Sequence, residues 1–340
     1  MIPRKRGPLE MNPDKKNLKF PSELRLDLVS KDWVVIATGR AKRPEMFRKE
    51  KRQKAEAPKE KCPFCYLGPE EKPLLVFPRV FVVPNKYPSF LPYPKLEKII
   101  EGNLYQKMNA VGFCELVVTK DHKKSLAQLP LEVVREVIDS YQERYLSLME
   151  KPNVKYISIF HNHGVEAGAS QSHPHSQIIT SPLIDEDLQR ALSISRDYFK
   201  RNKRCVYCQM VEWEKKTRER IIFENEDFLA LAPFASKAAF EIIVTPKNHL
   251  PYFERINEKE KEQLVEAFQA SLAKLYRGLN DPAYNFYLHT SPCDGKDYSY
   301  YHWHWTILPK TSIWAGFELG SRMEISTIEP EKAAEYLRRQ

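Results

Sequence analysis

Two long stretches of the chain carry apolar residues at the three-and-four spacing of an amphipathic helix. The first spans residues 129–149 and the second spans residues 257–276. Each pattern predicts a helix that buries one face in the core and exposes the other. The apolar positions are Val133, Val134, Val137, Ile138, Tyr141, Tyr145 and Leu148 in the first stretch, and Leu264, Val265, Phe268, Leu272, Leu275 and Tyr276 in the second.

Apolar runs of strand length surround the two helices in the same order, so the chain repeats itself. A run ending in a histidine precedes each helix, a second strand follows it, and a His-x-His strand comes last. A repeat unit of well over 100 residues is too long for a solenoid, so we infer a duplicated α/β module whose halves pack as one pseudo-symmetric body. The paired strands are 112–122 with 238–249, 156–161 with 284–289, and 172–180 with 301–309.

The composition bounds the class of protein. With 340 residues, 42% of them hydrophobic, the chain can bury a sizeable core, which excludes wholesale disorder. No stretch approaches the roughly 18 apolar residues of a membrane helix, and the amino terminus lacks the apolar segment of a secretory signal. We therefore expect a cytoplasmic protein that does not enter a membrane.

The net charge of +9 predicts an anionic ligand. Nucleic-acid binding would need the charge gathered on one element with aromatic residues between. The densest basic stretches, 1–20 and 43–61, instead alternate with Glu, Pro and Ala, as solvated segments do. A nucleic-acid partner is therefore not expected.

Four of the six cysteines form two Cys-x-x-Cys pairs, which indicate a metal or redox site in a cytosolic chain. A redox pair would open a helix, whereas the first pair runs through a turn into a strand. Each half also supplies one histidine and the first histidine of His-x-His, which completes a closed tetrahedral set for structural zinc. A lone histidine is more often a satisfied core residue, but recurrence in both halves favours ligation. The two predicted zinc sets are Cys62, Cys65, His122 and His173, and Cys205, Cys208, His249 and His302.

The strand around residue 173 carries the candidate chemistry. His173, His175 and Gln177 share one face of a strand, so with His173 bound to metal the neighbouring His175 is free to react. Just upstream, Gly168 and Ser170 lie in a loop of small residues that lets a phosphate approach backbone N–H groups. A neutral imidazole can attack phosphorus and form a covalent intermediate, while Gln177 donates to the oxygens where charge builds up.

The segment HNHGVEAGASQSHPHSQ at 161–177 resembles the signature of the galactose-1-phosphate uridylyltransferase branch of the histidine-triad superfamily. The CPFC motif at 62–65 and blocks at 27–44, 82–90, 301–310 and 315–320 agree, so the resemblance covers nearly the whole chain from about residue 24. It implies an α+β fold of two pseudo-symmetric histidine-triad-like modules, each an antiparallel sheet with helices, packed as one body. We expect a basic tail at 1–23, a catalytic module at 24–185 and a second module at 186–340.

The resemblance also implies an activity and the residues that carry it. His175 would attack the α-phosphorus of a UDP-sugar, and the uridylyl-histidine would pass UMP to a second hexose 1-phosphate in a ping-pong reaction. The implied enzyme is a UDP-glucose–hexose-1-phosphate uridylyltransferase acting as a homodimer. The implied roles are phosphoryl binding by Asn162, Gly168, Ser170 and Gln177, nucleotide contact by Asn85, diphosphate contact by Arg40 and Arg43 of the partner subunit, and sugar contact by Phe317 and Glu318.

Three departures from the best-known bacterial members leave alternatives open. The chain reads HPHSQ in place of HPHGQ, Ser312 replaces a lysine near the sugar site, and the second half keeps its own Cys pair. The last feature is shared with a plant-type ADP-glucose phosphorylase branch, so phosphorolysis of ADP-glucose or of a dinucleoside polyphosphate is the main alternative. A two-zinc nucleic-acid binding protein is a distant one, because it leaves the His-x-His strand without a purpose.

The second half poses two further questions. In relatives without the second Cys pair, the positions matching His289, His302 and His304 help bind iron, so iron is an alternative to zinc at the second site. His304 matches His175, but no Gly-Ala-Ser loop precedes it and Thr306 stands in the position of Gln177. We therefore predict that only the first half is catalytic.

Overall fold

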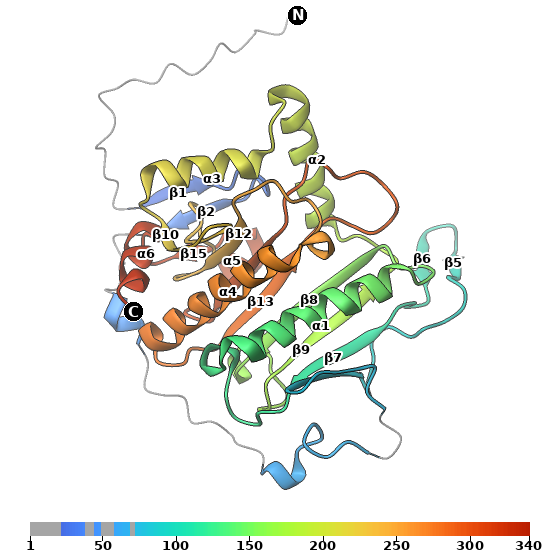
Figure 1. The fold of residues 1–340 in the computed structure, drawn as a ribbon. Helices are drawn as coiled ribbons and strands as arrows, with labels where there is room; N and C mark the ends of the chain where they lie inside the picture. The colour runs from blue at the N-terminus through green and yellow to red at the C-terminus, as the bar shows by residue number, and fades with distance from the viewer. Residues whose placement is uncertain (1–21, 38–43, 49–57, 69–71) are drawn as a thin grey trace, which may run out of the picture.

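A computed structural model describes residues 22–37, 44–48, 58–68 and 72–340 of the chain (Figure 1). Nearly all of the predicted tail at 1–23 lies outside these residues, as do Arg40 and Arg43. Fifteen strands and six α-helices are found in the described part of the chain. The strands are β1 Glu23–Leu26, β2 Trp33–Ile36, β3 Leu75–Val76, β4 Val80–Pro84, β5 Lys98–Glu101, β6 Tyr105–Met108, β7 Cys114–Thr119, β8 Tyr156–His163, β9 His175–Ser181, β10 Ile221–Glu224, β11 Phe228–Leu231, β12 Ile242–Pro246, β13 Tyr284–His289, β14 His304–Pro309 and β15 Ile325–Ser326. The helices are α1 Leu131–Met149, α2 Glu186–Asn202, α3 Val206–Thr217, α4 Glu258–Leu279, α5 Gly316–Ser321 and α6 Pro330–Arg338.

One ten-stranded sheet runs through both halves, in the order β10-β11-β12-β14-β13-β8-β9-β7-β4-β3. Its strand pairs are antiparallel, and the halves meet where β13 pairs with β8. Read outward from that junction, each strand of one half has a counterpart in the other: β8 with β13, β9 with β14, β7 with β12, β4 with β11 and β3 with β10. The α+β fold and its pseudo-symmetry are confirmed, and the two half-sheets join into one. The boundary at residue 185 stays a prediction.

Helices α1 and α4 lie side by side across one face of this sheet (Figure 1). Twelve of the thirteen apolar positions that predicted these helices are buried in one core, and Tyr276 is partly buried against it. The second helix begins as its sequence suggests, because Asn257 accepts a hydrogen bond from the Glu260 backbone N–H and Glu260 bonds back to the Asn257 N–H. Burial of these faces fixes how the sheet lies and leaves its other face for the functional residues.

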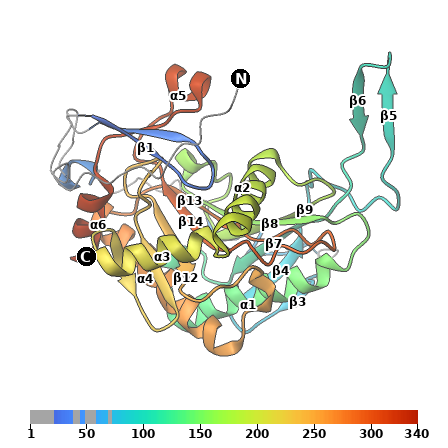
Figure 2. The ribbon, with the colours of Figure 1, turned by 90° about the horizontal axis from the view of Figure 1, so that it is seen from above.

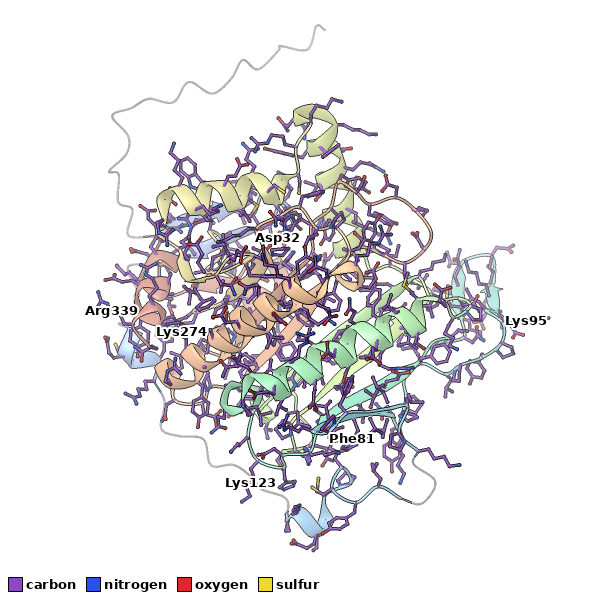
Figure 3. All side chains as sticks on the ribbon, viewed as in Figure 1. Asp32, Phe81, Lys95, Lys123, Lys274 and Arg339 are labelled. Atoms are coloured by element: carbon purple, nitrogen blue, oxygen red, sulfur yellow. The ribbon has the colours of Figure 1, made fainter. Side chains whose placement is uncertain are left out.

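The opposite face of the sheet is covered differently in the two halves. In the first half, Phe64 and Leu67 of the first Cys pair's loop pack on a small apolar cluster that includes Leu116 and Val118. In the second half, α2, α3 and the three-stranded sheet β1-β2-β15 lie over the face (Figure 2). The β5–β6 hairpin projects from the first half, well clear of the body (Figure 2). No described helix is long and apolar enough to cross a membrane.

Candidate active site and metal clusters

The nucleophile candidate opens strand β9. Ile178 is fully buried in the core on the α1 side, so the alternation of the strand turns His175 and Gln177 to the opposite face. The neighbouring strands hold β9 on both sides, with Val118 of β7 beside His175 and Phe160 of β8 beside Gln177. The predicted common face of His175 and Gln177 therefore lies on a central strand, away from α1.

His175 is held in one orientation by its surroundings. Its Nδ1–H donates to the backbone carbonyl of His173 at 3.0 Å, so the lone pair lies on Nε2. The Phe64 ring lies 4.9 Å from the His175 ring, centroid to centroid. Burial lowers the pKa of His175 below its usual value, which keeps the imidazole neutral at neutral pH. A neutral, oriented imidazole with a free Nε2 is the form that attacks phosphorus.

The loop between β8 and β9 passes close to Asn162. Gly168 adopts the left-handed conformation, with φ of 83°, which a side chain would strain. A Cβ at this glycine would lie 4.0 Å from the Asn162 Nδ2. Asn285, on β13 directly opposite Asn162, donates from Nδ2 to the Asn162 Oδ1 and to the Ala167 carbonyl, both at 2.8 Å. The second half thus fixes both the loop and the Asn162 amide.

Asn285 and Phe64 are the two residues of this site that sequence reasoning missed. Asn285 lies on the strand that crosses the junction between the halves, and its role depends on the register of that pairing. Phe64 lies inside the first Cys-x-x-Cys pair, where only the cysteines drew attention. The repeat could have identified Phe64, because Tyr207 is an aromatic residue at the same position of the second Cys-x-x-Cys pair. The Tyr207 ring lies 5.2 Å from the His304 ring, centroid to centroid.

The first predicted metal set comes together. The Sγ of Cys62 lies 3.3 Å from the Nδ1 of His173, and the Sγ of Cys65 lies 3.3 Å from the Nδ1 of His122. The two Nδ1 atoms are 3.2 Å apart. Tetrahedral zinc with its usual bond lengths would place sulfur and nitrogen ligands about 3.6 Å apart and two nitrogens about 3.3 Å apart. The spacing therefore fits one small tetrahedral ion.

The second set forms the same arrangement. Cys205, Cys208, His249 and His302 place their ligand atoms within 4.8 Å of one another, as the first four do. The Cys208 Sγ lies 3.3 Å from the His249 Nδ1 and 3.6 Å from the His302 Nδ1. Both predicted clusters of two thiols and two imidazoles are therefore present in the described part of the chain.

Carbonyl groups fix the orientation of three ligand histidines. The Nε2–H of His173 donates to the Thr119 carbonyl at 2.6 Å, and the Nε2–H of His302 donates to the Pro246 carbonyl at 3.0 Å. The Nε2–H of His249 bonds to another carbonyl, at 2.6 Å. With the proton on Nε2, each Nδ1 points its lone pair into the cluster, as a metal ligand must. The clusters are thus built to hold a metal, and zinc fits their donor atoms.

Comparison with known proteins identifies the family. Residues 14–184 match the model of the galactose-1-phosphate uridyl transferase N-terminal domain, and residues 120–339 match a domain of unknown function, DUF4921. The galactose-1-phosphate uridylyltransferase of Thermotoga maritima is 30% identical over 93% of this chain and 98% of its own. The chain belongs to the galactose-1-phosphate uridylyltransferase family. The prediction of an enzyme of this family is confirmed.

Two other relatives show how the family branches. The ADP-glucose phosphorylase of Arabidopsis thaliana is 31% identical over 93% of this chain and 92% of its own. A crystal structure of an ADP-glucose phosphorylase from Arabidopsis thaliana with bound ADP-glucose superposes with a TM-score of 0.78 at 29% identity and covers 94% of this chain and 99% of that one. A solved uridylyltransferase superposes with a TM-score of 0.74 at 27% identity, covering 93% and 97% of the two chains. A phosphorylase and a uridylyltransferase thus both share this fold.

The other residues that the family resemblance assigns to substrate contact lie in three different parts of the chain. Asn85 follows β4, two strands from β9, and its Oδ1 accepts from the Tyr87 N–H at 3.0 Å. Phe317 and Glu318 belong to α5, which lies over the second half, away from β9 (Figure 2). A single chain therefore does not bring the α5 residues to His175. Arg40 and Arg43 lie outside the described residues.

The second half repeats the Cys/His cluster but not the face that carries His175 and Gln177. His304 opens β14 as His175 opens β9, and the same strand turns Thr306 to the side that Gln177 occupies in the first half. His302 joins the Cys cluster, whereas His289 and His304 stack at 4.7 Å between ring centroids and line a cavity. This separation of His302 from the other two histidines favours the tetrahedral zinc set over a site built from all three.

Proposed function

We propose that the chain is a UDP-glucose–hexose-1-phosphate uridylyltransferase that works through a covalent uridylyl-His175 intermediate. The observation that carries the proposal is the His175 imidazole, fixed through Nδ1 by the His173 carbonyl and open at Nε2, beside the Gly168–Ser170 loop. Membership of the galactose-1-phosphate uridylyltransferase family supports it.

The reaction divides into two displacements at phosphorus. The Nε2 lone pair of His175 attacks the α-phosphorus of UDP-glucose, the bond to the bridging oxygen breaks, and glucose 1-phosphate leaves with that electron pair. A phosphate oxygen of the second hexose 1-phosphate then attacks the same phosphorus and releases a neutral His175. We assign Gln177 and the loop N–H groups, with Ser170, to the non-bridging oxygens, because they can donate where charge accumulates.

We propose that the remaining substrate contacts come from a second copy of the chain. The α5 residues Phe317 and Glu318 lie away from β9 in one chain, which supports their action in the partner's site (Figure 2). Arg40 and Arg43 would reach the diphosphate in the same way. Asn85, which the family motif assigns to the nucleotide, lies two strands from β9 in the same chain. The working enzyme is then a homodimer whose substrates are a UDP-sugar and a hexose 1-phosphate. A cytoplasmic location stays a prediction from the sequence.

We assign zinc to both Cys/His clusters, with a structural role. All four ligands in each cluster come from the protein, so no position stays open for a substrate. Burial raises the pKa of the Cys65 thiol to about 11, so a cation is needed to keep it as a thiolate at neutral pH. The zinc of the first cluster would join the Phe64 loop to His173, and so hold the ring that packs against His175.

The deciding experiment traps the intermediate. Purified protein is incubated with UDP-glucose or ADP-glucose labelled at the α-phosphate, without acceptor, and the protein-bound label is measured after denaturation. We expect one equivalent of acid-labile label from UDP-glucose, which galactose 1-phosphate removes. Label from ADP-glucose that phosphate removes would assign the chain to the phosphorylase reaction, which the 31% identical Arabidopsis relative makes the second candidate. No label from either sugar would refute the covalent mechanism.

His304→Ala should leave the amount of covalent adduct unchanged. His304 occupies the position of His175, but its strand has Thr306 in place of Gln177 and no small-residue loop before it. The same labelling assay checks this outcome, with His175→Ala as the matched variant in the first half. Loss of the adduct in His304→Ala together with its survival in His175→Ala would assign catalysis to the second half.

Asn285→Ala should slow transfer without preventing folding. The substitution removes both hydrogen bonds that hold the Asn162 amide and the Ala167 carbonyl. We expect kcat/KM to fall by about tenfold to a hundredfold, as for the loss of one or two half-buried hydrogen bonds. Steady-state kinetics test this, with Asn202→Ala as the control because that amide bonds only within exposed helix α2. Equal rates in both variants would contradict a positioning role.

A further inference from the structure

A cavity of about 1380 Å³ lies on the face of the sheet opposite α1 and α4, mostly over the second half, and crosses the junction onto β8 of the first half. Strands β13 and β14 and part of β8 line one side of it, and α2, α3 and the turn after β1 line the other. Phe160 and Asn162 of β8, together with Asn285 of β13, line its edge at the junction, whereas His175 does not line it. The volume exceeds what a small ligand requires, and a site with a few convergent polar groups in an aromatic-lined cavity is the usual form of a small-molecule pocket.

Three polar side chains of the described residues line the cavity from the sheet without a hydrogen bond to another protein group. They are His289, Tyr287 and Thr306. Thr306 is only 3% exposed. Burial lowers the pKa of His289 to about 4, and the nearby Asp185 and Asp27 oppose this only in part, so its ring is neutral and can both donate and accept. These groups need a ligand or water to satisfy them.

The charges around His289 favour a neutral ligand over a phosphate. Asp27 and Asp185 each use Oδ1 to accept backbone N–H groups, at 2.6–2.9 Å, and no described group bonds to either Oδ2. The cations near them are already paired, Lys237 with Asp32 at 2.9 Å and Arg190 with Asp32 at 3.3 Å. Two unshared carboxylate oxygens would repel a phosphate and would accept hydrogen bonds from hydroxyl groups.

The segment after β13, which stands where the Gly168–Ser170 loop stands in the first half, also argues against a phosphate ligand. Thr290 accepts the Phe253 N–H at 3.1 Å, and the Ser291 hydroxyl donates to the Pro251 carbonyl at 2.8 Å. Both hydroxyls are therefore bonded to a neighbouring segment and face no substrate. The second half does keep the aromatic ring of the first Cys pair's loop. Tyr207 corresponds to Phe64 and lines the cavity beside His304.

We propose that the second-half end of this cavity, between Tyr207 and His289, binds an uncharged nucleoside as a second site apart from His175. The base would stack on Tyr207, since aromatic rings hold bases by stacking, and its polar edge would bond to His289 and Thr306. The ribose hydroxyls would donate to Asp27 and Asp185, as ribose does to acidic residues in other nucleotide sites. On this proposal the second module keeps a nucleoside pocket although it has no phosphate-binding loop.

The test measures nucleoside binding to the full-length protein. Equilibrium dialysis is carried out with labelled uridine and adenosine, on the native chain and on the double variant Asp27→Asn/Asp185→Asn. Asparagine still accepts the backbone N–H groups that each aspartate now bonds, so the turn and the start of α2 stay formed. We expect saturable binding of at least one nucleoside, weakened by about tenfold or more in the double variant, with covalent labelling of His175 unchanged.

Two further variants distinguish the cavity from the catalytic site. Gln177→Ala alters the catalytic face and should leave the nucleoside affinity of the cavity as it is. His289→Leu removes the ring nitrogens at similar volume and should weaken nucleoside binding as the double variant does. The proposal is overturned if neither nucleoside saturates the native chain. It is also overturned if binding is lost in Gln177→Ala but unchanged in the cavity variants, because the nucleoside then occupies only the catalytic site.

Discussion

His175→Gly should abolish covalent transfer and should regain part of it when free imidazole is added. Loss of a nucleophile lowers kcat by about four orders of magnitude or more. The substitution leaves a hole the size of an imidazole beside the Phe64 ring, while His173, Gln177 and the loop keep their own contacts. Because the positioning groups stay in place, UDP-glucose should still bind and a diffusing imidazole can take the place of the side chain.

The measurement is the rate of UMP transfer in His175→Gly as a function of imidazole concentration, with UDP-glucose affinity measured separately. His173→Gly is the control, because its Nδ1 belongs to the metal cluster and its loss damages the fold of the Phe64 loop. Imidazole should give no rescue there. Rescue at residue 173 and none at 175 would mean that ligand and nucleophile are exchanged.

The sequence predicted the order of the two long helices and of the repeated strands around them, because the duplication repeated each of these patterns. A single apolar run is ambiguous, but two runs in the same order, each closed by the same Cys and His positions, are not. Both core helices and both metal clusters were found in this way. The joining of two half-sheets through β8 and β13 was not predicted, because that pairing depends on the edges of the modules rather than on any local pattern.

The sequence repeat gave the wrong residue-to-residue alignment for one pair of equivalent strands, β8 and β13. The apolar pattern aligns the strand ending at His161 with the strand ending at His289. In the sheet, His161 pairs with Ser176 and turns to the core, whereas His289 pairs with His304 and turns to the open face. The counterpart of His289 is therefore Asn162. An offset of one residue moves a side chain to the other face of a strand, and sequence alone cannot fix that offset in a buried strand.

The hydrogen-bond partners around the His175 site also could not be predicted from the sequence. Asn285 reaches the catalytic loop only because two strands, more than 100 residues apart in the chain, pair in one register. Ser176, the residue that departs from the bacterial pattern, turns to the core and accepts the Tyr141 hydroxyl at 2.6 Å. The departure at HPHSQ thus changes the packing beneath β9 and leaves the residues of its other face, His175 and Gln177, as in the family motif.

Loss of the first zinc should inactivate the enzyme, and loss of the second should not. Metal analysis of the native protein should give two equivalents of zinc per chain. Cys62→Ser and Cys205→Ser form a matched pair, because each removes one buried thiol from an equivalent cluster. Zinc binding to such sets is worth about 10–16 kcal/mol in small zinc-finger peptides, so each variant should lose one zinc and melt at a lower temperature.

The two variants should then differ in catalysis. The first cluster holds His173, whose carbonyl orients His175, and the loop that brings Phe64 against the nucleophile. Cys62→Ser should therefore lose the covalent adduct along with its zinc. The second cluster holds Tyr207 against His304, on the face that carries no nucleophile, so Cys205→Ser should keep the adduct at temperatures where circular dichroism shows it folded. Less than one equivalent of zinc in carefully purified native protein would exclude two zinc sites, and equal loss of adduct in both folded variants would exclude the division of roles between the halves.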